Sequence, residues 1–150
     1  MREPPGLEVR PATFADRGAA NRLLGAALVE EGRIVDADGV ARAVELALAQ
    51  GSSAWLVIAA PHGMPAGILL ANPVVSPALG GAALRIEALY VAPQHRGKGI
   101  ERALTDYVAT EARNNGLRSI EAESPTDASE PAWEALGFTS IARRRFTRVL

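Results

Sequence analysis

The sequence has 150 residues, 48% hydrophobic and 22% charged, with a formal net charge of -1. These values predict one globular domain over residues 1–150, argue against a wholly disordered chain, and give no electrostatic reason to expect a nucleic-acid partner. Because the sequence has no cysteine and only two histidines, disulfides, thiolate metal sites and a cysteine nucleophile are excluded, and we expect no metal site.

Membrane and targeting segments are not expected. The longest apolar stretch, Ala54–Ala60, is far shorter than the roughly 20 residues that a spanning helix needs. The first residues are not followed by an apolar run of the kind found in signal peptides. We therefore expect a cytoplasmic bacterial protein with no membrane partner.

The first part of the chain predicts one strand and two helices. Residues Leu7–Thr13 alternate between apolar and polar and indicate a strand. Thr13 and Asp16 have the spacing of a capping box, so a helix should follow them and end near Gly32. A second helix is expected over Asp38–Gln50.

Strands follow, and one of them carries a candidate functional residue. The expected strands are Trp55–Ala60, Ala66–Ala71 and Ala83–Val91, with a Pro-, Ser- and Gly-rich loop over Asn72–Gly81. Strict alternation over Ala83–Val91 predicts two faces for this strand. One face has Leu84, Ile86, Ala88 and Tyr90, and the other has Arg85, Glu87, Leu89 and Val91.

The last third of the chain predicts a β-α-β unit and a short ending. The expected elements after the loop Gln94–Gly99 are a helix over Ile100–Asn114, a strand over Arg118–Ser124, a helix over Ser129–Leu136 and a strand over Ile141–Leu150. The two strands around the longer helix should be roughly parallel. This order favours an α/β fold with a mixed sheet.

The loop Gln94–Gly99 is a candidate anion site. Glycines at the start of a helix let a ligand approach unpaired backbone N–H groups at the positive end of the helix dipole. Amides from Arg96 to Glu101 and the charges of Arg96 and Lys98 would suit a phosphate chain; the alternative is a plain tight turn. Lys98 is the only lysine among sixteen basic residues, which reflects either codon bias or a chemical role.

The loop resembles a known family motif. Gln94-x-x-Gly97-x-Gly99 is similar to the acyl-CoA-binding motif of the GNAT superfamily of N-acetyltransferases, while the patterns of the Walker A and dinucleotide loops are absent from the sequence. Leu89–Pro93 and Glu134–Phe138 also resemble segments of that family. The resemblance implies a central mixed, mostly antiparallel sheet with splayed middle strands, here Ala83–Val91 and Arg118–Ser124, and flanking helices.

The resemblance also implies a reaction and its site. Acetyl-CoA would be the cosubstrate, without a metal, and a small amine or peptide amine would attack the thioester directly. The residues implied to bind acetyl-CoA are Leu89, Tyr90, Val91, Gln94, Arg96, Gly97, Lys98, Gly99, Ile100, Glu101, Thr126 and Trp133. Glu87 is the candidate base; its alternative role is an ion pair with Arg85 or with an arginine of a neighbouring strand.

Two departures from the family pattern keep a second function open. Trp133 stands where many members have a tyrosine that acts as general acid, and an indole N–H cannot supply that proton. Glu101 stands where a small residue is usual, and its carboxylate would lie near bound phosphates. The alternative is therefore a non-catalytic acyl-CoA-binding or regulatory domain.

Further expectations concern the acceptor and the assembly. The resemblance implies that the loop between the first two helices helps to wall the acceptor site, where its acidic residues would suit a cationic amine; the alternative is that they simply face solvent. These residues are Glu30, Glu31, Asp36 and Asp38. The arginines of the final segment are expected on the solvent side of an edge strand. A homodimer is a further possible assembly.

Overall fold

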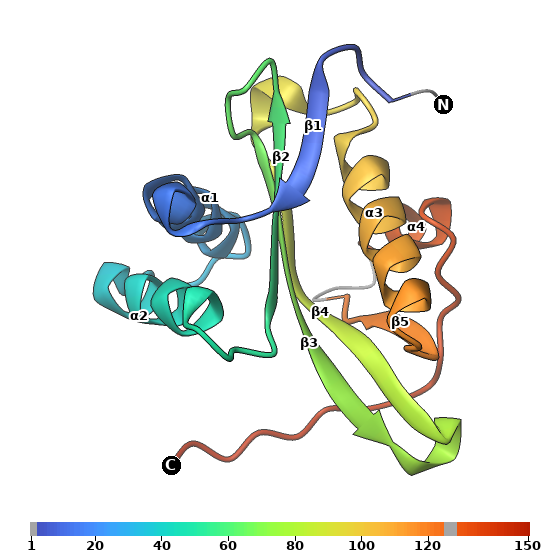
Figure 1. Ribbon diagram of the computed structural model, residues 1–150. Helices are drawn as coiled ribbons and strands as arrows, with labels where there is room; N and C mark the ends of the chain where they lie inside the picture. Colours follow the sequence, from blue (N-terminus) through green and yellow to red (C-terminus); the bar gives the residue numbers. More distant parts are fainter. Residues whose placement is uncertain (1–2, 125–128) are drawn as a thin grey trace.

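The computed structural model describes residues 3–124 and 129–150. One five-stranded sheet, in the order β1-β2-β3-β4-β5, forms its centre (Figure 1). The strands are β1 (Leu7–Pro11), β2 (Trp55–Pro61), β3 (Gly67–Ser76), β4 (Gly81–Val91) and β5 (Ser119–Ala122). The helices are α1 (Arg17–Glu30), α2 (Ala37–Leu48), α3 (Ile100–Asn114) and α4 (Glu130–Ala135).

The sheet is mixed, as the sequence predicts. β1 to β4 pair antiparallel with their neighbours in turn, and β5 pairs parallel with β4 after the crossover through α3. The predicted α/β class, with a mostly antiparallel sheet and flanking helices, is therefore confirmed.

Helices cover both faces of the sheet (Figure 1). On one face α1 and α2 supply the buried side chains Leu23, Val40 and Val44. On the other face α3 supplies Leu104 and Val108, both with no exposed surface. Two separate apolar cores therefore hold the sheet between its helices, and each is a large contribution to stability because burial removes apolar surface from water.

The loop predicted over Asn72–Gly81 is wrong for most of its length. β3 continues to Ser76, and its partners run from Arg85 opposite Asn72 to Gly81 opposite Ser76. The connection between the two strands is short: it consists of the 3₁₀ turn Pro77–Leu79 and of Gly80, which has the left-handed conformation. The ladder to β4 supplies hydrogen-bond partners that outweigh the local preference of Pro, Ser and Asn for turns.

The final strand predicted over Ile141–Leu150 is also wrong, because this segment has no regular secondary structure. A strand needs a neighbour for its ladder, and β5 is only four residues long. The segment instead runs away from α4 toward the C-terminus (Figure 1) and is tied to Glu123 by Arg145, with Nη1 to Oε2 at 2.8 Å. Phe146 in this segment is 89% exposed.

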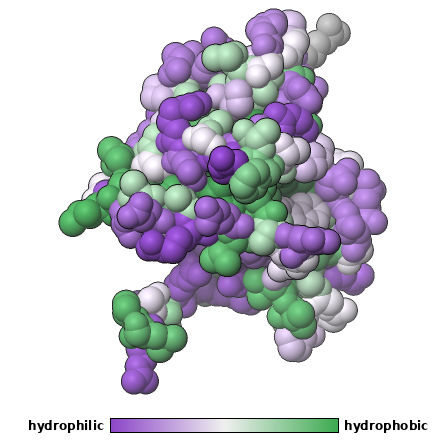
Figure 2. All heavy atoms as spheres, turned by 60° about the vertical axis from the view of Figure 1, so that its left-hand side comes forward, coloured by the Kyte–Doolittle hydropathy of each residue, from purple (hydrophilic) through white to green (hydrophobic). Residues whose placement is uncertain are grey.

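The surface is mixed in character. Apolar side chains are scattered among polar ones on the face that carries α1 and α2 (Figure 2). They include the exposed Val29, Ile34 and Leu46. Within the described residues, no helix combines the length and the apolar character that crossing a membrane requires.

Candidate functional site

A glycine-rich turn leads from β4 into α3. After β4 ends at Val91, the 3₁₀ turn Pro93–His95 turns the chain toward the helix. Gly97 and Gly99 have φ of 73° and 81°, in the left-handed region that favours glycine. The predicted loop and the predicted bounds of the following helix, Ile100–Asn114, are confirmed.

The start of α3 offers backbone donors. Gly99 is the N-cap residue and has no side chain to cap the helix; its carbonyl accepts the first helical bond from the N–H of Ala103, at 3.0 Å. The N–H groups of Ile100, Glu101 and Arg102 therefore have no partner within the helix. Together with the helix dipole they favour an anion at this end.

A cavity of about 360 Å³ lies at this helix start. The loop residues Arg96 and Gly97 and the first turn of α3 line it, and Leu136 closes it from the end of α4. Glu101 also lines it, so an acidic residue belongs to the same cavity as the helix amides. Lys98 is exposed and has no recorded side-chain partner among residues 3–124 and 129–150.

The side chain of Arg96 is directed to the protein itself. Its Nε donates to the carbonyl oxygen of Val91 at 2.9 Å, and its Nη2 lies 2.5 Å from Oε2 of Glu30. Its guanidinium also lies over the ring of Tyr90, 5.4 Å from the centroid. The hydrogen bond to Glu30 and the negative charge of Glu30 raise the pKa of Arg96. Arg96 therefore joins the loop to the last turn of α1 and to the end of β4.

Close packing of α3 on the sheet fixes the distance between the first turn of α3 and β3. A Cβ atom added to Gly67 in β3 would lie 3.0 Å from Cγ2 of Ile100 and 3.2 Å from Cδ1 of Leu104. Real Cβ atoms rarely come so close, so the first turn of α3 can approach β3 only because residue 67 is glycine. The sequence did not identify Gly67 as important, because no neighbouring residue indicates that α3 packs against this position.

β4 and the edge strand β5 separate beside the loop, so the splay that the resemblance implied between middle strands lies at the edge of this sheet. β4 and β5 pair only over Ala83–Ile86 and Ser119–Ala122, while β4 continues to Val91. The β4 residues beyond Ile86 thus have no β5 partner within the described part of the chain. The resulting opening lies between the two strands for which the family resemblance implies a splay.

Glu87 lies at the point where this opening begins. Leu70 of β3 pairs with Ala88, but Ala71 pairs with Ile86, so Glu87 is the extra residue of a β-bulge. β-Bulges redirect side chains and are frequent next to active sites. Glu87 is exposed, as a residue that must reach a substrate has to be.

The bulge overturns the predicted two faces of β4. Leu84 and Ile86 belong to the core under α3, but Tyr90 belongs to the core under α1 and α2, and Val91 returns to the α3 side. The alternation predicted Leu84, Ile86 and Tyr90 on one face, which is wrong because one inserted residue shifts every later side chain to the opposite face.

Neither alternative ion pair of Glu87 is formed among the described residues. Arg85 pairs with Glu121 instead, with Nη2 to Oε2 at 3.6 Å. Arg145 of the C-terminal segment is hydrogen-bonded to Glu123, which raises its pKa, and the charge of Glu87 raises it further. The charge of Glu87 thus acts on Arg145 without an ion pair between the two side chains.

Trp133 is a packing residue of α4. Its ring meets the ring of Phe138 edge-on, with centroids 5.0 Å apart and planes at 74°, and it packs against the core under α3. Arg102 in the first turn of α3 donates to the carbonyl oxygen of Ala135. These contacts hold α4 beside the helix start. Thr126 lies outside the described residues.

The acidic residues between α1 and α2 are mostly paired. Glu30 binds Arg96, and Glu31 pairs with Arg33 at 3.2 Å. Asp36 accepts from the N–H of Asp38 at 3.1 Å and from Arg42 at 3.3 Å. Their charges are thus largely offset within the protein. Among the described residues no group of His, Cys, Asp and Glu could hold a metal ion.

Comparisons with known proteins point to one family. Residues 37–138 match the family model of the acetyltransferase (GNAT) family. Mouse N-acetyltransferase 8 is 39% identical over 71 residues, which are 47% of this chain and 30% of that protein. The chain thus matches about a third of the length of this curated relative.

Solved structures share the fold. A possible acetyltransferase from Clostridium difficile 630 superposes with a TM-score of 0.85 at 18% identity, over 96% of this chain and 97% of that one. AAC(6')-Iy, solved in complex with the bisubstrate analog CoA-S-monomethyl-acetylneamine, superposes with a TM-score of 0.81 at 21% identity, over 96% and 98%.

Proposed function

Because the chain belongs to the acetyltransferase (GNAT) family, we propose that it transfers an acetyl group from acetyl-CoA to a primary amine. The observation that carries this proposal is the glycine loop at the start of α3, next to the point where β5 stops pairing with β4. We also propose that residues 1–150 act as a single domain.

The cavity at the start of α3 fits the pyrophosphate of acetyl-CoA. Unpaired amides of Gly97, Lys98 and the first turn of α3 would bind phosphate oxygens, because glycines allow the close approach and the helix dipole favours negative charge. Lys98 adds a flexible positive charge, and Gln94 lies in the same turn. The carboxylate of Glu101 opposes this binding in part, although Arg96 lies close enough for their charges to interact.

The pantetheine arm and the thioester would follow β4. Leu89, Tyr90 and Val91 have β3 partners but no recorded β5 partner, so their outer edge can bind an extended ligand. Trp133 would form part of the wall beyond the loop, and Thr126 is a further proposed contact. Backbone N–H groups on this edge would polarise the thioester carbonyl, which supplies the acetyl group.

Glu87 is proposed to accept the proton that the attacking amine loses. Its carboxylate is exposed at the bulge where the opening begins, so an amine could reach it directly or through one water molecule. Because Trp133 cannot serve as the acid, water would protonate the leaving thiolate. The acceptor is proposed to be a small amine or a peptide amine.

One alternative function has specific support. Trp133 in place of the usual acid and Glu101 on the cavity wall both favour a domain that binds acyl-CoA without turnover. Such a domain would act as a sensor or a regulatory unit. The two possibilities differ in whether CoA is released.

The test is release of CoA with a panel of amines. The protein is incubated with acetyl-CoA and an alkylamine, a peptide N-terminus or an aminoglycoside, and the free thiol is measured; the protein itself adds no thiol because it has no cysteine. We expect amine-dependent release. Calorimetry with acetyl-CoA accompanies it: heat without turnover would support the alternative, and no heat at millimolar acetyl-CoA would reject both functions.

The role of Glu87 has its own comparison. The variant Glu87→Gln should lower turnover by about 100-fold or more, the usual contribution of a general base, with little change in acetyl-CoA affinity. Glu45→Gln is the matched control, because Glu45 is exposed on α2 and distant in the fold from the opening between β4 and β5. Unchanged turnover in Glu87→Gln would remove this residue from the mechanism.

A further inference from the structure

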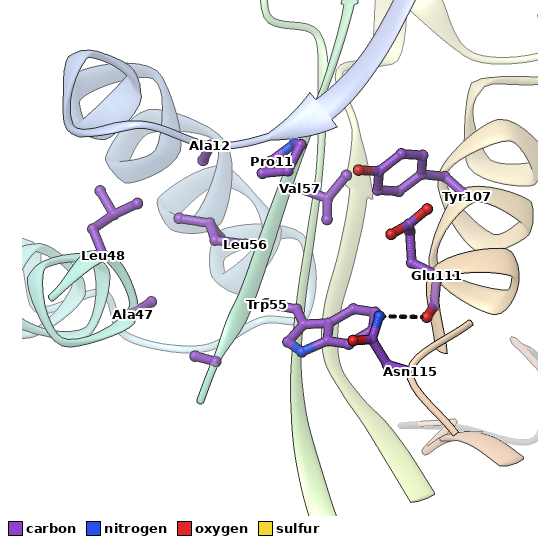
Figure 3. Close-up of a pocket in the computed structure, with 11 residues that line it drawn as sticks. Pro11, Ala12, Ala47, Leu48, Trp55, Leu56, Val57, Tyr107, Glu111 and Asn115 are labelled. Atoms are coloured by element: carbon purple, nitrogen blue, oxygen red, sulfur yellow. Dashed lines mark hydrogen bonds between the residues drawn. The ribbon is translucent and has the colours of Figure 1, made fainter. Parts of the chain in front are cut away.

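A second cavity, of about 400 Å³, lies at the beginning of β2. Trp55 lies at its base, and Tyr107 and Glu111 of α3 form one wall with Asn115, the C-cap residue of that helix (Figure 3). Leu48 of α2 lies on the opposite side. In the sheet order, β3 separates this region from β4, so the cavity is distinct from the opening between β4 and β5.

The cavity exists because β1 is shorter than β2. Pro11, the last residue of β1, pairs with Val57, and the N–H of Ala12 donates to the carbonyl oxygen of Leu56 at 2.7 Å. Trp55 lies beyond this last bond and has no β1 partner in the register. The open end of β2 therefore leaves a space that reaches from the end of α2 to α3.

One stripe of α3 supplies the polar wall. Tyr107 and Glu111 are four residues apart on one face of α3, and Asn115, the C-cap residue, follows Glu111 by four more residues on the same side. The side-chain Nδ2 of Asn115 donates to the backbone oxygen of Glu111 at 2.8 Å, which leaves the amide oxygen of Asn115 as an acceptor. The wall thus presents a carboxylate, a hydroxyl and an amide oxygen around the indole of Trp55 (Figure 3).

The charge of the cavity is negative. Glu111 is its single charged lining residue, and its carboxylate has no recorded ion pair or hydrogen bond within the part of the chain that the structure describes. Burial raises the pKa of Tyr107, and the charge of Glu111 raises it further, so the phenol is neutral and faces a negative field. An unpaired carboxylate beside two aromatic rings is the chemistry that recognises a cation.

We propose that this cavity binds a primary alkylammonium ion. Its three N–H donors match the carboxylate of Glu111, the hydroxyl of Tyr107 and the amide oxygen of Asn115, and the positive charge also faces the ring of Trp55. The alkyl chain would lie against Pro11 and Val57, which line the cavity on the side of β2 that faces Tyr107 (Figure 3). This site is separate from the proposed acetyl-CoA site and gives the protein a second means of recognising an amine.

Tryptophan fluorescence tests the proposal without acetyl-CoA or turnover. The chain has two tryptophans, so in Trp133→Phe the emission comes from Trp55 alone. This variant is titrated with hexylammonium chloride and with the neutral 1-hexanol. We expect a saturating change with hexylammonium and at least tenfold weaker binding of hexanol, because the alcohol carries no positive charge to offset that of Glu111 and has one O–H donor in place of three N–H donors.

Variants of the carboxylate complete the test. Glu111→Gln in the same background should weaken hexylammonium binding at least tenfold, Glu111→Asp should retain part of it, and the exposed Glu45→Gln should leave it unchanged. Circular dichroism verifies that each variant is folded. Equal binding of hexanol, or full affinity in Glu111→Gln, would overturn the proposal. Failure of this site would leave CoA release unaffected, so the two proposals fail independently.

Discussion

Asp16 connects the end of β1 to the start of α1, and its removal gives a stability change that can be worked out from the structure. Its carboxylate accepts from Nη1 and Nη2 of Arg10 at 2.7 and 2.9 Å and from the N–H of Thr13 at 2.7 Å. Only 9% of the side chain is exposed. The hydrogen bonds from Arg10, and to a lesser extent the N–H of Thr13, lower the pKa of Asp16 from 3.8 to about 2.

This pKa shift sets the expected magnitude and its pH dependence. One pKa unit corresponds to about 1.4 kcal/mol, so the ionised carboxylate stabilises the fold by about 2 kcal/mol. Because the pKa of Asp16 is lower in the folded state, this stabilisation is fully present above about pH 5. It is lost as the pH falls through 3.8 toward about 2, where the folded state also becomes protonated.

Urea unfolding of the variant Asp16→Asn measures both quantities. At pH 7 its free energy of unfolding should be lower than that of the parent by about 2 kcal/mol, and the difference should shrink between pH 5 and pH 2. Asp106→Asn is the matched control, since Asp106 is exposed on α3, and it should change stability by less than about 0.5 kcal/mol. A difference for Asp16→Asn that is as small as the control, or that does not depend on pH, would refute the reasoning.

Three further variants test the packing and charge of the loop. Leu104→Ala removes a fully buried side chain of α3 and should cost about 2–5 kcal/mol in urea unfolding; a loss below 1 kcal/mol would mean that the site collapses around the change. Gly67→Ala should displace Ile100 and weaken acetyl-CoA binding in calorimetry. Unaltered affinity would show that the close approach of α3 to β3 is not needed for acetyl-CoA binding. Lys98→Ala should weaken acetyl-CoA binding only a few-fold, because backbone amides make most of the contacts; complete loss would contradict this.

Local signals in the sequence were sufficient for the loop and its helix. Gly97 and Gly99 have the positive φ that such a loop requires, and the predicted Ile100–Asn114 agrees with α3 at both ends. Apolar spacing and a terminal Asn-Asn-Gly are short-range features, so no distant contact was needed to read them. The same holds for the pairing of Thr13 with Asp16 before α1.

The strands depended on partners that a single sequence does not display. Asn72–Ser76 became strand because β4 pairs with it, and Ile141–Leu150 did not because no strand pairs with it. Glu87 in the bulge is the same kind of case: alternation predicts side-chain faces only as long as both strands advance one residue at a time. The sequence identified Glu87 as a candidate base, but the bulge that exposes it is a property of the β3–β4 pair.

The role of Arg96 depends on a contact between residues that are far apart in the sequence. The charge of Arg96 in the loop favoured a direct contact with phosphate, but its guanidinium is held by Glu30 and by the carbonyl oxygen of Val91. Since that charge is largely offset, the phosphate charges would have to be met by the helix amides and Lys98. Arg96 would then serve as a positioning residue, because it connects the loop to the end of β4 and to the last turn of α1.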